Sequence, residues 1–283
     1  MNLKKQIKMN ETKVISIDLY ADFGFFKKPF SNERLDLYLT FNMLHKPALL
    51  GILGAILGFA GYKKNEELPE YYVKLKDLKI GIEPIEEYQS KVLSEKGIFQ
   101  KTTLKYNNSV GYANMQNGIP CNLIINEQII ISPAYRCYIL LDNSVDNNLK
   151  FQITEYLKNA YAEYLPYFGK NEFSCWWEKD SYKEYKIINK ESNAIKISSI
   201  FYLKSATLKE SEDMEFDISK LFDTEKPYAY FERLPIDFMK IDDGYQYRLE
   251  KFIYSNLKLK NNASIENLFH LECDDEKKYI QFF

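Results

Sequence analysis

The chain has 283 residues, 46% of them hydrophobic and 28% charged, and its 38 Lys and Arg nearly balance 40 Asp and Glu. A disordered chain would need fewer apolar residues and a larger charge imbalance, so that class is excluded. The length allows one large domain or two small ones. The four cysteines show no short pair spacing, which predicts no disulfide framework and indicates a reducing, cytoplasmic compartment. The basic and then polar first residues do not form a signal-peptide pattern.

The first predicted element is a strand over residues 13–22. Ile15, Ile17 and Leu19 alternate with a polar face, which is typical of a half-buried strand. The segment 23–46 that follows begins with an aromatic and basic run and shows no periodicity. A loop of this length inside a compact domain is usually functional or flexible.

The most apolar part of the chain, residues 47–62, predicts a helix that is too short to cross a bilayer. Pro47 suits its first turn. Gly51, Gly54 and Gly58 fall on one stripe, which would let the helix backbone lie close against a sheet. Because these glycines lie inside the helix and not in the turn before it, the pattern favours packing over a phosphate cradle.

The remaining predicted elements are mostly strands. Strands are expected over 71–82, 98–107, 134–142 and 173–186 and as two short pieces within 121–132, with a hairpin turn at Asn117–Gly118 and a helix over 149–164 that Pro166 and Gly169 end. The order strand, helix, several strands, helix, strand is the β-α-β-β-α-β plan of ferredoxin-like folds. Residues 191–283 contain strand-like runs and no clear helix. We therefore expect an α+β protein, with a ferredoxin-like domain over 1–190 and a smaller β-rich domain over 191–283.

Signatures of common enzymes are missing from the sequence. Two histidines are too few for an ordinary zinc site. The motifs GxxxxGK[ST], HExxH, GxSxG and GxGxxG are absent as well. We expect no metal and no cofactor, and the absences together favour a binding or structural role.

Aromatic and basic residues gather in and after the first strand. Sheets of this class that bind RNA expose aromatic rings for base stacking and surround them with basic residues that neutralise phosphates. The candidates here are Tyr20, Phe25, Phe26, Lys27 and Lys28, followed by Arg34, Tyr38 and Lys46. The alternative is that these rings are simply core residues, and the 42 Phe and Tyr of the chain keep that alternative open.

Four stretches of the chain resemble one protein family, the Cas-five family of CRISPR-associated proteins. The matching residues are Gly24, Phe26, Lys28, Pro29 and Ser31 in the first loop; Pro47, Leu50, Gly51, Gly54 and Gly58 in the helix; Pro133, Tyr135, Arg136 and Tyr138 in a later strand; and Pro166, Gly169, Glu172 and Phe173 in a turn. The order and spacing of the four stretches, more than any one of them, carry the resemblance. Within the family the chain looks most like the type I-B branch.

The resemblance implies both a fold and a function. Members of this family are RAMP-superfamily subunits of type I CRISPR effector complexes (Cascade), with a ferredoxin-like domain, a long thumb hairpin and a variable C-terminal part. They hold the 5′ handle of the CRISPR RNA (crRNA) and cap the backbone filament in antiviral defence. The implied partners are therefore the crRNA handle, the backbone RAMP subunit, the large subunit and target DNA near the PAM, with no membrane. Sequence specificity for the target then comes from base pairing.

The resemblance also directs the choice of site residues. For the handle-facing surface we select Phe26, Lys27, Lys28, Arg34, His45 and Lys46, with Arg136 and Tyr138 as second choices. Family members often carry an Arg-rich loop where this chain has Phe26-Lys27-Lys28, so its phosphate contacts would come mainly from lysines, which act as point charges.

Two alternative functions remain open from the sequence. In the type I-C branch the corresponding protein is a metal-independent endoribonuclease that processes crRNA precursors, and His45 is the candidate catalytic residue for such a reaction here. The other histidine, His270, fits a packed C-terminal element. The second alternative is a module that binds only proteins, through its Tyr-rich C-terminal strands and apolar last residues.

Overall fold

The computed structural model describes most of the chain. The described residues are 12–29, 37–64, 66–85, 100–108, 115–116, 119–120, 123–189, 195–208, 222–223, 228–242, 244–259 and 263–283. Ser31 and Arg34, and the hairpin turn expected at Asn117–Gly118, lie outside these residues.

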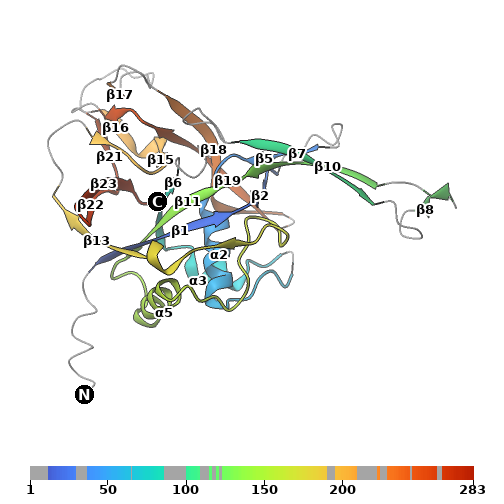
Figure 1. Ribbon diagram of the computed structural model, residues 1–283, viewed down its shortest axis with the longest axis horizontal. Helices are drawn as coiled ribbons and strands as arrows, with labels where there is room; N and C mark the ends of the chain where they lie inside the picture. The colour runs from blue at the N-terminus through green and yellow to red at the C-terminus, as the bar shows by residue number, and fades with distance from the viewer. Residues whose placement is uncertain are drawn as a thin grey trace.

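An antiparallel main sheet forms the centre of the fold (Figure 1). Its strands follow the order β23-β22-β13-β1-β11-β6, namely β23 (Glu276–Gln281), β22 (Leu268–Cys273), β13 (Lys183–Ile188), β1 (Lys13–Ala21), β11 (Ala134–Leu141) and β6 (Lys79–Pro84), while β12 (Cys175–Trp176) also pairs with β1. The strands predicted over 13–22 and 134–142 are confirmed. The strand expected over 173–186 is divided into β12 and β13 by the 3₁₀ turn Lys179–Ser181.

Strand β1 is buried on both of its faces. Ile15, Ile17 and Leu19 face the main core, as predicted, and are fully buried. Ser16 and Asp18, on the face expected to be polar and solvated, are also buried. The expectation of a half-exposed strand is wrong because residues of β13 and of the C-terminal hairpin β22–β23 cover that second face.

Three helices lie together on one side of the main sheet (Figure 1). They are α2 (Lys46–Leu57), α3 (Glu70–Leu75) and α5 (Asn147–Lys158). Helix α2 confirms the predicted apolar helix, although it ends at Leu57, where Gly58 adopts a left-handed conformation. Among the described residues no helix has the length and apolar character needed to cross a membrane.

The strand expected over residues 71–82 is wrong in its first half, which forms α3. Pro69 precedes this helix, and Tyr72 and Leu75 bury one of its faces in the main core. Tyr71 packs on α2 at Gly54, where an added Cβ would overlap the Cβ of the tyrosine. The glycine stripe therefore serves close packing, as predicted, but its neighbour is a helix and not the sheet. Packing against α2 overrides the strand propensity of the aromatic and β-branched residues.

Helix α5 ends earlier than its aromatic periodicity predicts. It begins at the N-cap Asp146 and ends at Lys158, whereas the sequence favoured a helix to residue 164. The backbone N–H groups of Glu163 and Tyr164 instead donate to the carbonyl oxygens of Ile56 and Ala55, each at 3.0 Å. These bonds reach carbonyl groups in the last turn of α2, where Ala55 also accepts from the N–H of the C-cap Gly58 at 3.3 Å.

A long hairpin of β7 (Lys101–Asn108) and β10 (Leu123–Ile131) extends away from the rest of the molecule (Figure 1). The two short strands expected within 121–132 are therefore one continuous strand. At the base of the hairpin, β10 also pairs with β2 (Phe23–Gly24) and β4 (Leu37–Tyr38). Four further short strands belong to this part: β3 (Phe26–Lys27) pairs with β5 (Thr40–Phe41), and β8 (Met115–Gln116) with β9 (Ile119–Pro120).

The C-terminal part is rich in strands, as predicted. Its elements are β14 (Ile195–Lys196), β15 (Phe201–Tyr202), β16 (Ala206–Leu208), β17 (Phe222–Asp223), β18 (Ala229–Ile241), β19 (Gly244–Ser255), β20 (Lys258–Leu259) and β21 (Ala263–Ile265), followed by β22 and β23 of the main sheet. Within its described residues the helical content is one 3₁₀ turn, Leu203–Ser205. The pairing of β13 with β22 crosses the expected boundary near residue 190, and a division into two domains stays a prediction.

Candidate nucleic-acid interface

The loop after β1 forms the first wall of the candidate interface. The backbone N–H of Phe26 donates to Thr40 Oγ1 at 2.9 Å, and the Phe26 ring is buried against Phe168 with centroids 5.6 Å apart. The next residue, Lys27, points outward, and its Nζ lies 4.1 Å from the centroid of the Tyr38 ring. The loop therefore places one predicted residue in the core and the other at the surface.

Gly169, which is distant from this loop in the sequence, lies against the backbone of the loop. The N–H of Phe25 donates to the carbonyl oxygen of Phe168 at 3.0 Å, so the two backbones run side by side. Gly169 has a φ of 85°, and an added Cβ would overlap the carbonyl oxygen of Phe25. A glycine is needed here both for the left-handed conformation and for the close approach.

The start of helix α2 forms the second wall. His45 is the N-cap of the helix, and its Nδ1 accepts a hydrogen bond from the N–H of Ala48 at 3.3 Å. The imidazole is buried between Phe41 and Tyr247, at centroid distances of 5.3 and 5.5 Å. Burial lowers its pKa from 6.5 to about 3, so the ring is neutral near pH 7. His45 therefore serves as a packed helix cap.

Between the two walls lies an elongated hollow of about 630 Å³, which we call the aromatic groove. Its lining includes Phe25, Phe26, Lys27, His45, Gly51, Tyr62, Tyr71, Tyr164, Leu165, Tyr167, Gly169 and Tyr247. Tyr62, Tyr164 and Tyr167 are 56%, 60% and 43% exposed, and Leu165 is 68% exposed. Exposed rings beside a lysine can stack on planar bases while the cation binds a neighbouring phosphate.

The groove tyrosines are candidate binding residues that the sequence analysis did not select. They come from the segment after α2, the segment after α5 and strand β19, which are far apart in the chain. The run YAEYLPYFG over 161–169 was a usable signal, since its aromatic density exceeds what a short turn needs. Tyr161 and Tyr164 of this run were instead assigned to the periodic face of a helix.

Two other selected lysines are engaged within the protein. Lys28 forms an ion pair with the buried carboxylate of Glu232 at 2.9 Å. Lys46 donates from Nζ to the carbonyl oxygen of Phe283 at 3.1 Å, and burial lowers its pKa to about 8. Both lysines link the N-terminal half to the C-terminal strands, which reduces their capacity to bind an external phosphate.

The second-choice residues lie on the opposite face of the main sheet. Arg136 donates from Nε and Nη2 to the two carboxylate oxygens of Asp18, at 2.6 and 2.8 Å. The hydroxyl of Tyr138 donates to Glu83 at 2.6 Å, and burial raises the pKa of that tyrosine. Tyr135, the residue before Arg136 on the same strand, belongs to the main core on the other face and packs on Phe168. The structure therefore does not bring Arg136 and Tyr138 together with Phe26, Lys27 and His45.

The projecting hairpin contributes further cations near the loop. Lys105 is exposed on β7, whereas Lys101 donates to the side chain of Asn42. At the hairpin base Lys170 pairs with Glu127 at 2.7 Å and lies 4.7 Å from the centroid of Tyr106. Among the described residues no group of three or more His, Cys, Asp or Glu side chains could hold a metal ion.

Comparison with known proteins gives matches among solved structures. No protein-family model and no curated protein matches the chain. A chain of a CRISPR RNA-guided surveillance complex is similar with a TM-score of 0.48 and 8% identity, over 88% of this chain and 92% of the other. A CRISPR protein from Archaeoglobus fulgidus has a TM-score of 0.41 and 10% identity, over 95% and 98% of the two chains. A third, described as a CRISPR-associated protein, has a TM-score of 0.30 and 10% identity, over 60% and 66%. These structural neighbours are CRISPR-associated proteins, and at such identities none of them assigns a role to a residue of the groove.

Proposed function

We propose that the chain is a CRISPR RNA-binding subunit of a type I effector complex, of the type I-B branch, which holds the 5′ handle of the crRNA and caps the backbone filament. One observation carries the proposal. The described part of the first loop and helix α2, which carry two of the four family-like motifs, contribute the two walls of one aromatic groove. Lys27 lies at the outward side of that groove. The motif residues Phe26, Pro47 and Gly51, which are apart in the sequence, thus line one hollow.

The topology supports the fold that this function requires. The elements β1, α2, β6, β11, α5 and β13 follow the β-α-β-β-α-β order, and their strands are neighbours in the sequence β13-β1-β11-β6. We assign this unit to the ferredoxin-like RAMP fold. The hairpin β7–β10, inserted between β6 and β11, corresponds in this assignment to the thumb.

The binding mode that follows differs from stacking on an open sheet. In many RNA-binding sheets of this class the bases stack on the face that the helices leave free. Here hairpin β22–β23 packs on that face through Leu271, Ile280 and residues around them. The exposed rings lie instead on the helix side, at Tyr62, Tyr164 and Tyr167. We therefore place the handle along α2, with its bases on these tyrosines and a phosphate near Lys27, where each stacked base contributes roughly 1–3 kcal/mol.

The endoribonuclease alternative gains no support from this geometry. The candidate base that the sequence offered is His45. The imidazole is almost fully buried, and its Nδ1 is occupied by the N–H of Ala48. A general base needs a free acceptor within hydrogen-bonding reach of the substrate hydroxyl. The partners that we propose are accordingly those of a binding subunit: the crRNA handle, the backbone and large subunits, and target DNA near the PAM.

A binding assay with matched variants tests the proposal. Purified protein is incubated in EDTA with end-labelled repeat RNA from the source genome and with the corresponding 5′-handle RNA. We expect the handle to bind and the repeat to remain uncut. Lys27→Ala combined with Tyr164→Ala should weaken handle binding by about tenfold or more, because one stacked base and one phosphate contact are lost.

The control variant combines Lys76→Ala with Tyr161→Ala. Lys76 is exposed, and Tyr161 is 49% exposed in the same segment as Tyr164, but neither residue lines the groove. Its affinity for the handle should equal that of the wild type. An equal loss in both double variants, or no preference for the handle over an unrelated RNA of the same length, would contradict the proposal. A single cut at the base of the repeat hairpin would make the protein the processing nuclease instead.

A further inference from the structure

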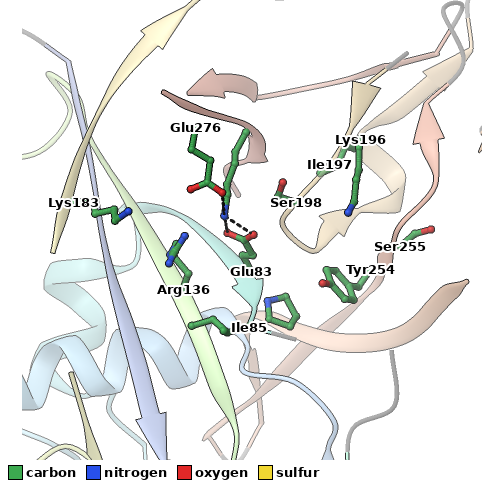
Figure 2. Close-up of a pocket in the computed structure, with 12 residues that line it drawn as sticks. Glu83, Ile85, Arg136, Lys183, Lys196, Ile197, Ser198, Tyr254, Ser255 and Glu276 are labelled. Carbon is green, nitrogen blue, oxygen red and sulfur yellow. Dashed lines mark hydrogen bonds and ion pairs between the residues drawn. The ribbon is translucent and has the colours of Figure 1, made fainter. Parts of the chain in front are cut away.

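A second hollow of about 330 Å³ lies on the face of the main sheet that is opposite α2, between the sheet and the C-terminal strands. We call it the charged pocket. Figure 2 shows Arg136 and Lys183 on the side of the main sheet and Lys196 across the pocket from them. Lys278, from β23, also lines it. Four cations from four different strands therefore converge on one space.

The two carboxylates that share this pocket both pair with one of these cations. Lys278 Nζ lies 3.0 and 3.3 Å from the two carboxylate oxygens of Glu83 and 3.2 Å from Glu276. Glu83 also accepts the hydroxyl of Tyr138 at 2.6 Å. Lys278 and the two glutamates together carry one net negative charge, which the positive charges of Lys183 and Lys196 outweigh.

The other three cations keep unused donors. Arg136 binds Asp18 through Nε and Nη2, and its Nη1 has no hydrogen-bond partner among the described residues. Within the described part of the chain, Lys183 forms one ion pair, with Asp274 at 3.8 Å, which is longer than a hydrogen bond. Lys196 forms no ion pair with any residue that the structure describes. The free hydrogen-bonding capacity of the pocket is therefore mainly that of donors.

The volume of the charged pocket and its uncharged lining residues indicate which class of anion it would bind. Phosphate suits a guanidinium and lysines because its oxygens accept several charged hydrogen bonds at once. The volume falls near the lower end of pockets for small organic ligands, about 300–1,000 Å³, and exceeds what a bare ion needs. Ile85, Ile197 and Tyr254 add apolar surface beside the hydroxyl of Ser198 (Figure 2). We infer that the charged pocket binds a nucleoside monophosphate unit, with the phosphate between Arg136, Lys183 and Lys196.

This inference does not depend on the proposed function, because the pocket and the aromatic groove lie on opposite faces of the sheet and share no residue. Isothermal titration calorimetry with the four 5′-ribonucleoside monophosphates and with the matching nucleosides tests it. We expect at least one monophosphate to bind about tenfold or more tightly than its nucleoside, since the phosphate accepts charge-assisted hydrogen bonds that the nucleoside cannot form.

Matched variants locate the bound phosphate. Lys183→Ala combined with Lys196→Ala should weaken binding by about tenfold or more. Lys186→Ala is the control, because Lys186 is exposed on the same strand as Lys183, with its side chain on the opposite face, and does not line the pocket. Arg136 is left unchanged, since its loss would leave Asp18 buried without its partner.

A second arm separates a free nucleotide from the end of a strand. Short RNA with a 5′-phosphate or a 5′-hydroxyl is titrated into the variant with Lys27→Ala and Tyr164→Ala, which weakens the groove. Tighter binding of the phosphorylated RNA than of the free monophosphate assigns the pocket to a strand terminus; the reverse assigns it to a free nucleotide. The inference is overturned if neither the monophosphates nor the phosphorylated RNA bind better than their unphosphorylated counterparts, or if Lys186→Ala weakens binding as much as the double variant.

Discussion

The aromatic groove and the charged pocket lie on opposite faces of one sheet, and their side chains are held in opposite ways. The groove presents exposed tyrosines such as Tyr62 and Tyr164, whose rings bury little apolar surface in the fold. The pocket presents charges that also hold the fold together. Asp18 and Arg136 form an ion pair across the neighbouring strands β1 and β11, and Glu83 and Lys278 form one between β6 and β23, the two ends of the strand order. The comparison teaches that exposed side chains of the groove can be substituted with little change in the unfolding free energy. Substituting a paired charge of the pocket changes both its surface and the unfolding free energy.

The largest expected effect on the unfolding free energy comes from breaking the buried ion pair between Asp18 and Arg136, on the pocket side of the sheet. Asp18→Ala leaves the guanidinium of Arg136 without its carboxylate, in a pair whose side chains are 9% and 17% exposed. Removing one partner of a buried pair costs about 3–5 kcal/mol of unfolding free energy. Urea denaturation measures the loss.

The matched control is Asp274→Asn, which removes the negative charge beside Lys183 and keeps a residue that tolerates the left-handed conformation of this turn (φ 50°). That carboxylate is 81% exposed and 3.8 Å from its cation, so its removal should leave the unfolding free energy nearly unchanged. Equal losses in the two variants would show that burial does not distinguish the pairs.

The next effect concerns the helix that forms one wall of the groove. Gly54→Ala should lower the unfolding free energy by about 1–3 kcal/mol, because the new methyl group would overlap Tyr71 of α3. Gly51→Ala is the control in the same helix. Its added Cβ would lie 3.7 Å from the Tyr71 ring, an ordinary contact, so the higher helix propensity of alanine should stabilise the protein by up to about 1 kcal/mol. Thermal denaturation of both variants shows whether each change raises or lowers the unfolding free energy. Losses of similar size in the two variants would contradict the packing described for the glycine stripe.

A smaller effect is expected from acid, through the cap of the same helix. The pKa of His45 is about 3 in the fold and near 6.5 when the chain is unfolded. Below pH 6.5 the unfolded chain therefore binds a proton that the folded protein does not. Stability is complete above that pH and falls towards pH 3, by about 1.4 kcal/mol at pH 5.5. Tyr247, which packs on the imidazole, stays neutral in this window because burial raises its pKa to about 12.

His45→Asn separates this titration from the capping. Asparagine is a good N-cap residue and does not titrate. The variant is expected to be less stable than the wild type at pH 7, because it loses the contacts of the ring, and the difference should shrink by about 1.4 kcal/mol at pH 5.5. Urea midpoints at the two pH values measure it. A constant difference would show that the imidazole is accessible to protons in the folded protein.

The smallest expected effect is on the stability of groove variants. Tyr164→Ala removes a ring that is 60% exposed and keeps the backbone bond from Tyr164 to Ala55. The unfolding free energy should change by less than about 0.5 kcal/mol, which is typical of surface substitutions. Differential scanning calorimetry can measure this, and a large loss would mean that the groove, like the pocket, is coupled to the fold.

Local periodicity predicted the helices and strands that have a strong, continuous apolar pattern. The strand over 13–21 and the helix over 46–57 have continuous apolar patterns, and both were expected nearly where they occur. The prediction failed where packing decided the conformation. Residues 70–75 form a helix against α2, and α5 ends at Lys158 because the following backbone binds the end of α2.

For the candidate site the sequence determined which residue types stand in the first loop and at the start of α2, and from these it predicted Phe26, Lys27 and His45 on one surface. Only the tertiary structure decided their roles. Phe26 and His45 are buried, Lys27 is exposed, and the tyrosines of the groove arrive from three distant segments. The physical reason is that burial and charge pairing depend on which element covers a side chain. Those contacts are set by register and packing between strands and helices that are far apart in the chain.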